Sequence, residues 1–289
     1  MIASPYFFGR ERVRMGRGVD AILAAGLVDA VAGVQLGSDG GTVRWVEPQQ
    51  EYRDDVGATF DLCSSIADAV AAAVDRAAVP LVLAGNCMAT LGVLAGLRTN
   101  SLGVVWLDAH ADFNTADSTL SGYVDGTALA TVTGRCWKRV AARVDGFAPI
   151  ADDRVVLVGA RSLDEPEHEL LAASGVHRVG ATRDVSVDQR RSLDEAVDGL
   201  AERVRGVHLH VDLDVLDPDL VAPANEFAAP GGLTTLGVTE VIRRVTARIP
   251  VRSVTLACYD PAGDPGGRVA AAAVDIARSI RSAIASPPA

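Results

Sequence analysis

The sequence predicts an α/β protein built on one mainly parallel β-sheet. Short apolar runs rich in β-branched residues alternate with longer stretches rich in Ala and Leu along the whole chain. This alternation is typical of strands joined by crossover helices. The sequence has no long linker, internal repeat or low-complexity tract, so we expect residues 1–289 to form a single domain.

The individual elements follow from local patterns. Short apolar runs bounded by Gly, Pro or polar residues predict strands, and longer Ala- and Leu-rich stretches predict helices. The expected strands are Ile2–Phe8, Thr42–Val46, Leu81–Ala84, Gly103–Leu107, Arg154–Val158, Gly175–Val179, His208–Leu213 and Val251–Ala257. The expected helices are Gly18–Ala25, Thr59–Ala77, Ala89–Arg98, Glu165–Ser174, Val187–Arg205, Thr235–Ile249 and Arg268–Ala285.

Composition narrows the class of function. The chain has 289 residues, of which 49% are hydrophobic, and a net charge of -10. This acidic balance argues against nucleic acid and anionic membrane surfaces as partners. The four cysteines show no C-x-x-C spacing, which predicts a reducing compartment. Because the Met1–Arg10 segment lacks the order of a signal peptide and no apolar stretch reaches the ~18 residues of a membrane span, we expect a soluble, cytoplasmic protein.

Candidate metal ligands follow three of the predicted strands. They are Cys87 after Leu81–Ala84, Asp108, His110 and Asp112 after Gly103–Leu107, and Asp212 and Asp214 at the end of His208–Leu213. The carboxyl ends of parallel strands share one edge of the sheet, where ligands bind. Residues two apart in an extended segment point the same way, so the acids within each motif would lie close together.

Acids gathered in this way need a counter-charge in order to ionise together. Oxygen donors with one imidazole suit Mn²⁺, although Zn²⁺ or Fe²⁺ could also bind. Six candidate ligands are more than one ion needs, so two bridged ions fit their number better. The sequence therefore predicts a binuclear metal site. His208 and His210 lie deeper in their strand and are expected to be core or supporting residues.

These segments resemble signatures of a known superfamily. Trp106–Asn114, which reads W-L-D-A-H-A-D-F-N, is similar to the second signature of the arginase, agmatinase and formimidoylglutamase enzymes, the ureohydrolases. Val211–Pro218 is similar to the third signature, and Ala224–Thr234 to the Gly-rich segment that follows it. The resemblance runs from about Leu81 to the C-terminal helix. It implies a three-layer α/β/α domain with an eight-stranded, mainly parallel sheet and two Mn²⁺ ions per chain.

The resemblance also implies roles for the six ligands. Asp108 and Asp212 would bridge both ions, His110 and Asp214 would complete one ion, and Asp112 and Cys87 the other. A hydroxide between the ions would attack the carbon of a linear amidine or guanidine. His110 is therefore also a candidate catalytic residue.

The chain departs from the superfamily at a metal-ligand position. Cys87, in Ala84–Met88, stands where the family has the histidine of a Gly-Gly-Asp-His-Ser segment. A thiolate can bind a metal ion, and relatives that act on N-hydroxylated arginine look similar here. We expect Cys87 to be a ligand. The alternative is a buried packing residue beside a weakened or empty metal position.

A second departure concerns proton transfer. Asp125, in Gly122–Gly126, aligns with the proton-shuttling histidine of a Gly-x-x-His-Gly segment. Burial among other acids could raise the pKa of Asp125 enough for it to relay a proton. The same residue could equally cap a helix or orient a loop. Asp125 is thus a candidate catalytic residue with a structural alternative.

A third departure concerns the substrate. Cys258 stands where arginase-like members hold the guanidinium with a glutamate, in a Glu-x-Asn-Pro segment. Asp260 and Glu226 are the candidate replacements, and Asn114 is a further candidate contact. Without a dedicated carboxylate, a neutral or hydroxylated guanidine is a better expected substrate than arginine itself.

The predicted function is binuclear Mn-dependent hydrolysis of a guanidino or amidine C–N bond in a small molecule, in a chain that could form a homo-oligomer. Two alternatives stay open. A deacetylase-like amidohydrolase would share the fold and keep one metal ion. A metal-dependent binding protein without turnover would explain the missing histidine and glutamate.

Overall fold

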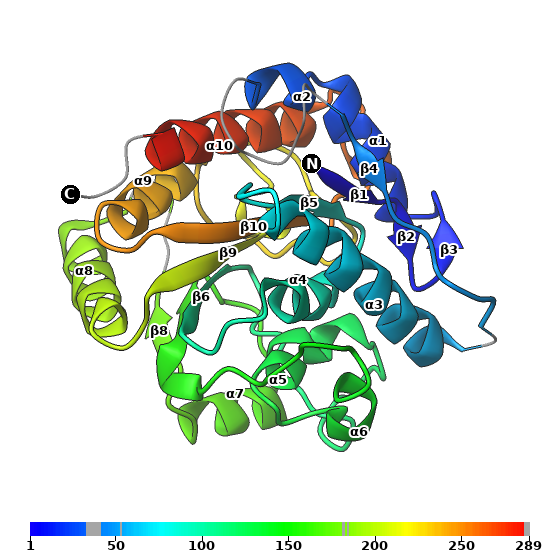
Figure 1. The fold of residues 1–289 in the computed structure, drawn as a ribbon. Coiled ribbons are helices and arrows are strands. Elements are labelled where there is room, and N and C mark those ends of the chain that lie inside the picture. The colour runs from blue at the N-terminus through cyan, green and yellow to red at the C-terminus, as the bar shows by residue number, and fades with distance from the viewer. Residues whose placement is uncertain (33–41, 53, 181–182, 184, 286–289) are drawn as a thin grey trace.

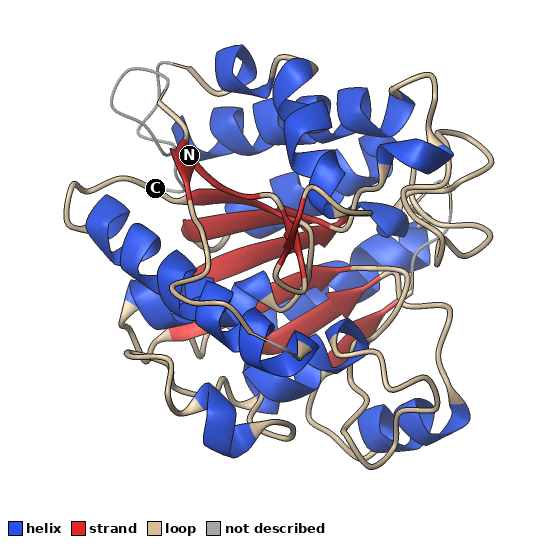
Figure 2. Ribbon diagram, turned by 90° about the vertical axis from the view of Figure 1, so that its right-hand side faces the viewer, coloured by secondary structure: helices blue, strands red, loops and turns tan. Residues whose placement is uncertain are grey.

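The computed structural model describes residues 1–32, 42–52, 54–180, 183 and 185–285. Its described part contains an eight-stranded sheet in the order β4-β1-β5-β10-β9-β6-β7-β8, in which neighbouring strands run parallel. Helices cover both faces of the sheet (Figures 1 and 2). The predicted three-layer α/β/α arrangement with an eight-stranded sheet is therefore confirmed.

The strands of the main sheet are β1 (Ile2–Ser4), β4 (Arg44–Trp45), β5 (Leu81–Ala84), β6 (Leu102–Leu107), β7 (Val155–Val158), β8 (His177–Val179), β9 (Gly206–Asp212) and β10 (Val251–Ala257). The helices are α1 (Gly16–Ala24), α2 (Leu27–Ala30), α3 (Asp55–Val74), α4 (Ala89–Leu97), α5 (Ala128–Val132), α6 (Lys138–Ala141), α7 (Glu165–Ala172), α8 (Val187–Ala201), α9 (Thr235–Thr246) and α10 (Arg268–Ala285). Assignment of residues 1–289 to a single domain stays a prediction.

The expected strand Ile2–Phe8 is the clearest departure. β1 ends at Ser4, and β2 (Tyr6–Phe7) pairs antiparallel with β3 (Arg10–Glu11) outside the main sheet. Pro5 separates the two strands, and proline cannot donate the backbone hydrogen bond that a continuing central strand needs. The short helices α2, α5 and α6 were not predicted, because four or five residues are too few to display a helical period.

The sheet separates two apolar cores. Alternate residues of β6 face opposite sides, with Val105 and Leu107 in one core and Val104 and Trp106 in the other. The first core is closed by α1, α2, α8, α9 and α10, and the second by α3, α4, α5 and α7. Because helices cover both faces, β5 and β6 are apolar throughout instead of alternating with polar residues.

Helix α3 corrects one expectation from the sequence. By length and composition alone it could cross a membrane, with 20 residues and a mean hydropathy of 1.3. However, 67% of that apolar window is buried inside the fold, where α3 packs along α4. A core helix of a globular protein passes the same test, so this helix is weak grounds for a membrane span.

The strand order explains how distant segments meet. β5, β10, β9 and β6 are consecutive neighbours, and Ala257 at the end of β10 pairs with both Ala84 and Asp212. The residues that follow these strands therefore emerge side by side at one edge. Helix α1 packs tightly against the segment after β10: a Cβ on Gly18 would lie 1.9 Å from the carbonyl oxygen of Tyr259. Glycine at position 18 permits this approach.

Candidate functional site

A cavity of about 550 Å³ opens at the carboxyl edge of the sheet. Its size suits a small-molecule substrate. The lining includes most of the residues singled out from the sequence. They are Cys87, His110, Asp112, Asn114, Asp125, Asp212, Asp214 and Cys258. Asp108 lies directly behind this lining and is fully buried.

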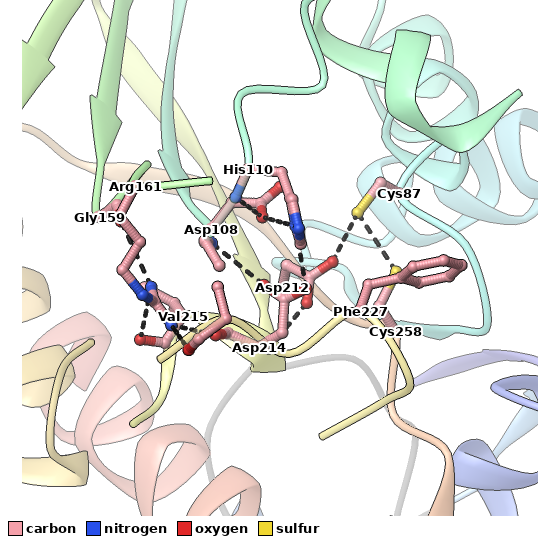
Figure 3. Close-up of polar contacts among 12 residues, drawn as sticks. Cys87, Asp108, His110, Gly159, Arg161, Asp212, Asp214, Val215, Phe227 and Cys258 are labelled. Atoms are coloured by element: carbon pink, nitrogen blue, oxygen red, sulfur yellow. Dashed lines mark hydrogen bonds and ion pairs between the residues drawn. The ribbon is translucent and has the colours of Figure 1, made fainter. Parts of the chain in front are cut away.

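Three of the predicted ligands converge on one side of the cavity. Nδ1 of His110 lies 3.2 Å from Oδ2 of Asp214 and 3.5 Å from Oδ1 of Asp108, as Figure 3 shows. The ligand atoms of the three side chains lie within 4.8 Å of one another. The indole of Trp106 donates to Oδ2 of Asp108 at 2.9 Å, and the Ala109 amide donates to Oδ1 of Asp214 at 3.0 Å. These hydrogen bonds fix both carboxylates in place. We call Asp108, His110 and Asp214 the oxygen-rich cluster.

Asp112 reaches the same cavity by a different route. Its φ of 50° lies in the left-handed region, so the chain is not extended at this position. The rule that alternate residues share a side therefore does not apply to Asp112. Burial raises its pKa well above the usual value, and the carboxylates of Asp108, Asp125 and Asp212 add to this effect. Asp112 thus belongs to the same group of buried acids.

The oxygen-rich cluster holds a proton that a cation could replace. Burial opposes a charge on His110, but its hydrogen bonds to Asp108 and Asp214 outweigh burial and raise the pKa of His110 to about 12. Burial also raises the pKa of Asp108 to about 7. For Asp214, the opposing effect of burial is overcome by the hydrogen bond to His110, and its pKa falls to about 2. A bound metal ion would take the place of the imidazolium proton.

Two thiols form the opposite side of the site. Sγ of Cys87 lies 3.3 Å from Sγ of Cys258, 3.1 Å from Oδ2 of Asp212 and 3.2 Å from Nε2 of His210. Figure 3 shows both sulfur atoms beside Asp212, with the ring of Phe227 next to Cys258. Both cysteines are almost fully buried, yet both contribute to the cavity lining. Of these two cysteines, sequence reasoning predicted only Cys87 as a metal ligand.

Asp125 is held by the loop that carries Cys87. Its Oδ2 accepts from the side-chain amide of Asn86 and the backbone amide of Cys87, each at 2.9 Å, and its Oδ1 accepts from the amide of Met88 at 2.9 Å. Burial raises the pKa of Asp125, whereas these hydrogen bonds lower it. The contacts support the loop-orienting alternative. The proton relay stays a prediction.

The four candidate substrate contacts divide into two groups. Asn114 and Cys258 line the cavity, and Nδ2 of Asn114 donates to Asp164 at 3.3 Å. Glu226 and Asp260 are not among the described residues that line the cavity. Glu226 is paired with Arg14, and Asp260 with Arg17 at 2.9 Å. Each acid thus already has a cationic partner outside the cavity.

Sequence reasoning missed two acids, Asp164 and Glu167, on the side of the cavity formed by the start of α7, here called the outer wall. Asp164 and Glu167 line the cavity at the start of α7, and Oε1 of Glu167 accepts from the Phe113 amide at 2.8 Å. Both residues follow β7, whose carboxyl end lies at the same edge as the candidate metal ligands. The rule that directed attention to the other strand ends would have identified them. Tyr123, Asn225 and Phe227 were also missed, because they lie in loops of irregular conformation.

The two strand histidines are buried, as expected, and are linked by Thr90. Oγ1 of Thr90 lies 2.7 Å from Nδ1 of His210 and 3.4 Å from Nε2 of His208. Burial lowers the pKa of His208 to about 3 and that of His210 well below its usual value. Both imidazoles are therefore neutral. His210 also stacks on Trp106 and contacts the sulfur of Cys87, so it supports the site directly.

Arg161 braces the loop that carries Asp214. Its guanidinium donates to the carbonyl oxygens of Asp214 and Ala229, each at 3.0 Å, and to that of Pro230 at 3.0 Å. Its backbone amide donates to the carbonyl of Ala109 at 2.8 Å. One residue thereby ties together the segments that follow β6, β7 and β9. The planar fork of arginine matches several acceptors at once in a way that lysine does not.

We expect Arg161→Met to destabilise the protein by about 3 kcal/mol, because it leaves several buried carbonyls without donors. Affinity for a metal ion should fall as well, since Asp214 loses its support. Urea unfolding and metal titration measure the two effects. Arg139→Met on exposed α6 is the matched control and should change neither quantity. Wild-type stability in Arg161→Met would contradict the bracing role.

The fold and the site together define a metal-dependent enzyme of the α/β/α class, with its candidate ligands at the carboxyl edge of a parallel sheet. The chain belongs to the arginase family, whose sequence profile it matches over residues 22–282. It is 32% identical over 245 residues to an arginase of Bacillus caldovelox, and this match covers 81% of each chain. The structure is similar to the crystal structure of arginase from Bacillus subtilis, with a TM-score of 0.82, 27% identity and 96% of each chain covered.

A formimidoylglutamase structure from Bacillus subtilis shares the fold, with a TM-score of 0.75 and 17% identity, and covers 100% of this chain and 87% of that one. The predicted membership of the ureohydrolase superfamily is confirmed. The prediction that the chain is a hydrolase acting on C–N bonds other than peptide bonds is also confirmed at the level of the family.

Proposed function

We propose that this protein hydrolyses the guanidino C–N bond of a small molecule with two Mn²⁺ ions per chain. The observation that carries the proposal is the convergence of Asp108, His110 and Asp214 within 4.8 Å at the wall of the cavity. Asp112 and Asp212 complete a ring of buried acids around the same space. Such a group of carboxylates is stable only with protons or cations.

The donor chemistry supports manganese on the side of His110. Carboxylate oxygens and one imidazole are the ligands that Mn²⁺ accepts readily. Asp108, His110, Asp212 and Asp214 would hold one ion, and Asp108, Asp112, Asp212 and Cys87 would hold the other. Divalent cations in such a site polarise the substrate and activate water for attack. The sulfur of Cys87 is the donor that suits manganese least.

The remaining residues would position the substrate. Asp164 and Glu167 place carboxylates on the outer wall, where they suit the amino group of an amino-acid substrate. The amide of Asn114 is fixed by Asp164 and by Ser118, so it offers a preorganised polar contact. These groups would orient the substrate so that its guanidino carbon faces the oxygen-rich cluster.

The side of the cavity that carries Cys258, here called the inner wall, favours a guanidine of reduced basicity. At the position of the expected carboxylate, the cavity presents the thiol of Cys258, and the two substitute acids Glu226 and Asp260 pair with arginines instead. Asp125, whose Oδ2 lies 3.7 Å from Sγ of Cys258, already accepts three hydrogen bonds, and desolvating a guanidinium without a dedicated ionic partner is costly. An N-hydroxyguanidine carries an electron-withdrawing hydroxyl, which favours its neutral form. We therefore infer that hydroxyarginine is hydrolysed in preference to arginine.

A substrate panel tests the proposal. Purified protein with Mn²⁺ is assayed against arginine, hydroxyarginine, agmatine, guanidinobutyrate and formiminoglutamate, with amine and urea-type products measured by mass spectrometry. We expect hydroxyarginine to give a kcat/KM at least tenfold above that of arginine. Absence of hydrolysis across the panel would reject the function, and a preference for arginine would reject the argument from the inner wall.

Metal stoichiometry separates this function from a deacetylase-like amidohydrolase. Two ions per chain favour the proposed reaction, and a single ion favours the amidohydrolase. Location in the cytoplasm and assembly into a homo-oligomer stay predictions, which cell fractionation and light scattering would test.

A further inference from the structure

The two ends of the site differ in chemical character. Asp108, His110 and Asp214 offer oxygen and imidazole nitrogen. At the other end, the side chains of Cys87, Cys258 and Asp125 place their ligand atoms within 4.8 Å of one another. A hard ion such as Mn²⁺ prefers oxygen donors, whereas paired thiolates select softer ions such as Zn²⁺. One pair of identical ions would therefore leave one end poorly matched.

The thiol end has nearly the dimensions of a tetrahedral zinc site. Zn–S bonds of about 2.3 Å place two sulfur ligands about 3.8 Å apart, and a sulfur and a carboxylate oxygen about 3.6 Å apart. The Cys87 and Cys258 sulfurs are 3.3 Å apart. Sγ of Cys258 lies 3.7 Å from Oδ2 of Asp125, and Sγ of Cys87 lies 3.1 Å from Oδ2 of Asp212. Shifts of about half an ångström would bring these three distances to the tetrahedral values.

We propose that zinc takes the place of the second Mn²⁺ at this end, with Cys87, Cys258, Asp125 and Asp212 as ligands, so that the centre binds one Zn²⁺ and one Mn²⁺. Asp212 lies between the two ends and would be shared by both ions. The inference rests on the proposed function only for the presence of a metal centre. It gives Asp125 a ligand role in place of the proton relay.

The surroundings of the thiols support a structured site. Nε2 of His210 lies 3.2 Å from Sγ of Cys87, and its Nδ1 is held by Thr90 at 2.7 Å. With the Thr90 hydroxyl donating to Nδ1, the neutral imidazole carries its proton on Nε2 and directs it at the sulfur. A hydrogen bond of this kind stabilises a thiolate ligand. The amide of Asn86 and two backbone amides fix Asp125 in the same way.

X-ray absorption at the zinc edge tests the proposal without turnover. The full-length protein is stripped of metal under reducing conditions and loaded with one equivalent each of Zn²⁺ and Mn²⁺. We expect two sulfur scatterers per zinc at about 2.3 Å. With Co²⁺ in place of zinc, a sulfur-to-cobalt charge-transfer band should appear in the near ultraviolet. Zero or one sulfur per zinc, or failure to bind zinc, would overturn the assignment.

Variants distinguish the thiol end from a general preference for zinc, which most protein sites show over manganese. Cys258→Ser should leave one sulfur per zinc and lower zinc affinity more than about tenfold, with little change in manganese affinity. Cys258→Glu and Cys87→His, which replace sulfur with oxygen or nitrogen, should each shift the metal preference of the site from zinc towards manganese. Cys136→Ala, a buried cysteine outside the cavity lining, is the control. An unchanged preference in all three variants would refute the site.

This experiment also separates the two proposals. Two sulfurs on zinc together with no hydrolysis of any guanidine would uphold the zinc site and reject the proposed reaction. Hydrolysis of a guanidine by a protein whose zinc shows no sulfur ligand would uphold the proposed reaction and reject the zinc site.

Discussion

Asp214→Asn is expected to lower kcat/KM about a thousandfold. The carboxylate of Asp214 contacts His110 at 3.2 Å and accepts from the Ala109 amide, so the substitution removes a proposed metal ligand and the partner of the imidazole. Metal affinity should fall by about 100-fold or more. Steady-state kinetics with the best substrate of the panel and metal titration by calorimetry measure the two losses.

The same substitution carries a readout that does not depend on turnover. Asp214 and Asp108 together raise the pKa of His110 to about 12. Without the Asp214 charge, the pKa of His110 should fall in the metal-free protein, and NMR titration of the ring measures it. Asp145→Asn is the matched control, because Asp145 is 94% exposed and remote from the cavity lining. A variant with wild-type metal affinity would show that Asp214 is not a ligand.

The metal-free protein is expected to lose stability as the pH rises from about 4 to about 7. Asp108 is fully buried, and burial raises its pKa from 3.8 to about 7. A raised acid pKa contributes stability that is complete below the unfolded-state value and lost as the pH passes the folded-state value. For Asp108 alone the loss is about 4 kcal/mol. Burial of Asp112 and Asp212 acts in the same direction.

Two buried histidines offset part of this loss: burial lowers the pKa of His208 to about 3 and that of His210 well below its usual value, so each adds stability as the pH rises towards 6.5. The favourable contribution of Asp214 is lost only as the pH falls through about 2, and that of His110 only as it rises through about 12. Both are nearly constant between pH 4 and 6.5. Three acids with a raised pKa, Asp108, Asp112 and Asp212, outnumber the two histidines, so the net slope of stability against pH should still be negative in this range.

Bound Mn²⁺ should reverse this slope, because metal replaces protons on the buried acids. At 1,000 times the dissociation constant the gain is about 4 kcal/mol, or about 7 °C in Tm. Thermal unfolding between pH 4 and 8, with chelator or with Mn²⁺, measures both slopes. Asp108→Asn should flatten the metal-free slope, whereas Asp145→Asn should not. Equal slopes with and without metal would contradict the assignment of these acids as ligands.

The sequence predicted the fold well because its strongest signals are local. Runs such as Leu81–Ala84 and Gly103–Leu107 are apolar throughout, as strands covered on both faces must be. The predicted strand Ile2–Phe8 was wrong in its second half, where Pro5 redirects the chain. Most of the candidate ligands could be found in the same way, because they directly follow a strand.

The contacts across the site could not be predicted from local signals. The meeting of Cys87 with Cys258 depends on β5 and β10 being neighbours, and no local pattern reports that order. The pairing of Glu226 with Arg14 likewise depends on long-range packing. Asp164 could have been found, because it follows β7 at the same edge, but its segment lacks a recognisable motif.

The adjacency of β5 and β10 has a consequence for how this centre could change. The two sulfur atoms come from positions 171 residues apart, yet they touch. Substitutions at contacting positions do not act independently. Restoring a histidine at 87 while sulfur remains at 258, or a glutamate at 258 while sulfur remains at 87, would create a mixed donor set. Descendants of this chain should therefore exchange the two residues together, and a double-mutant cycle would show the coupling.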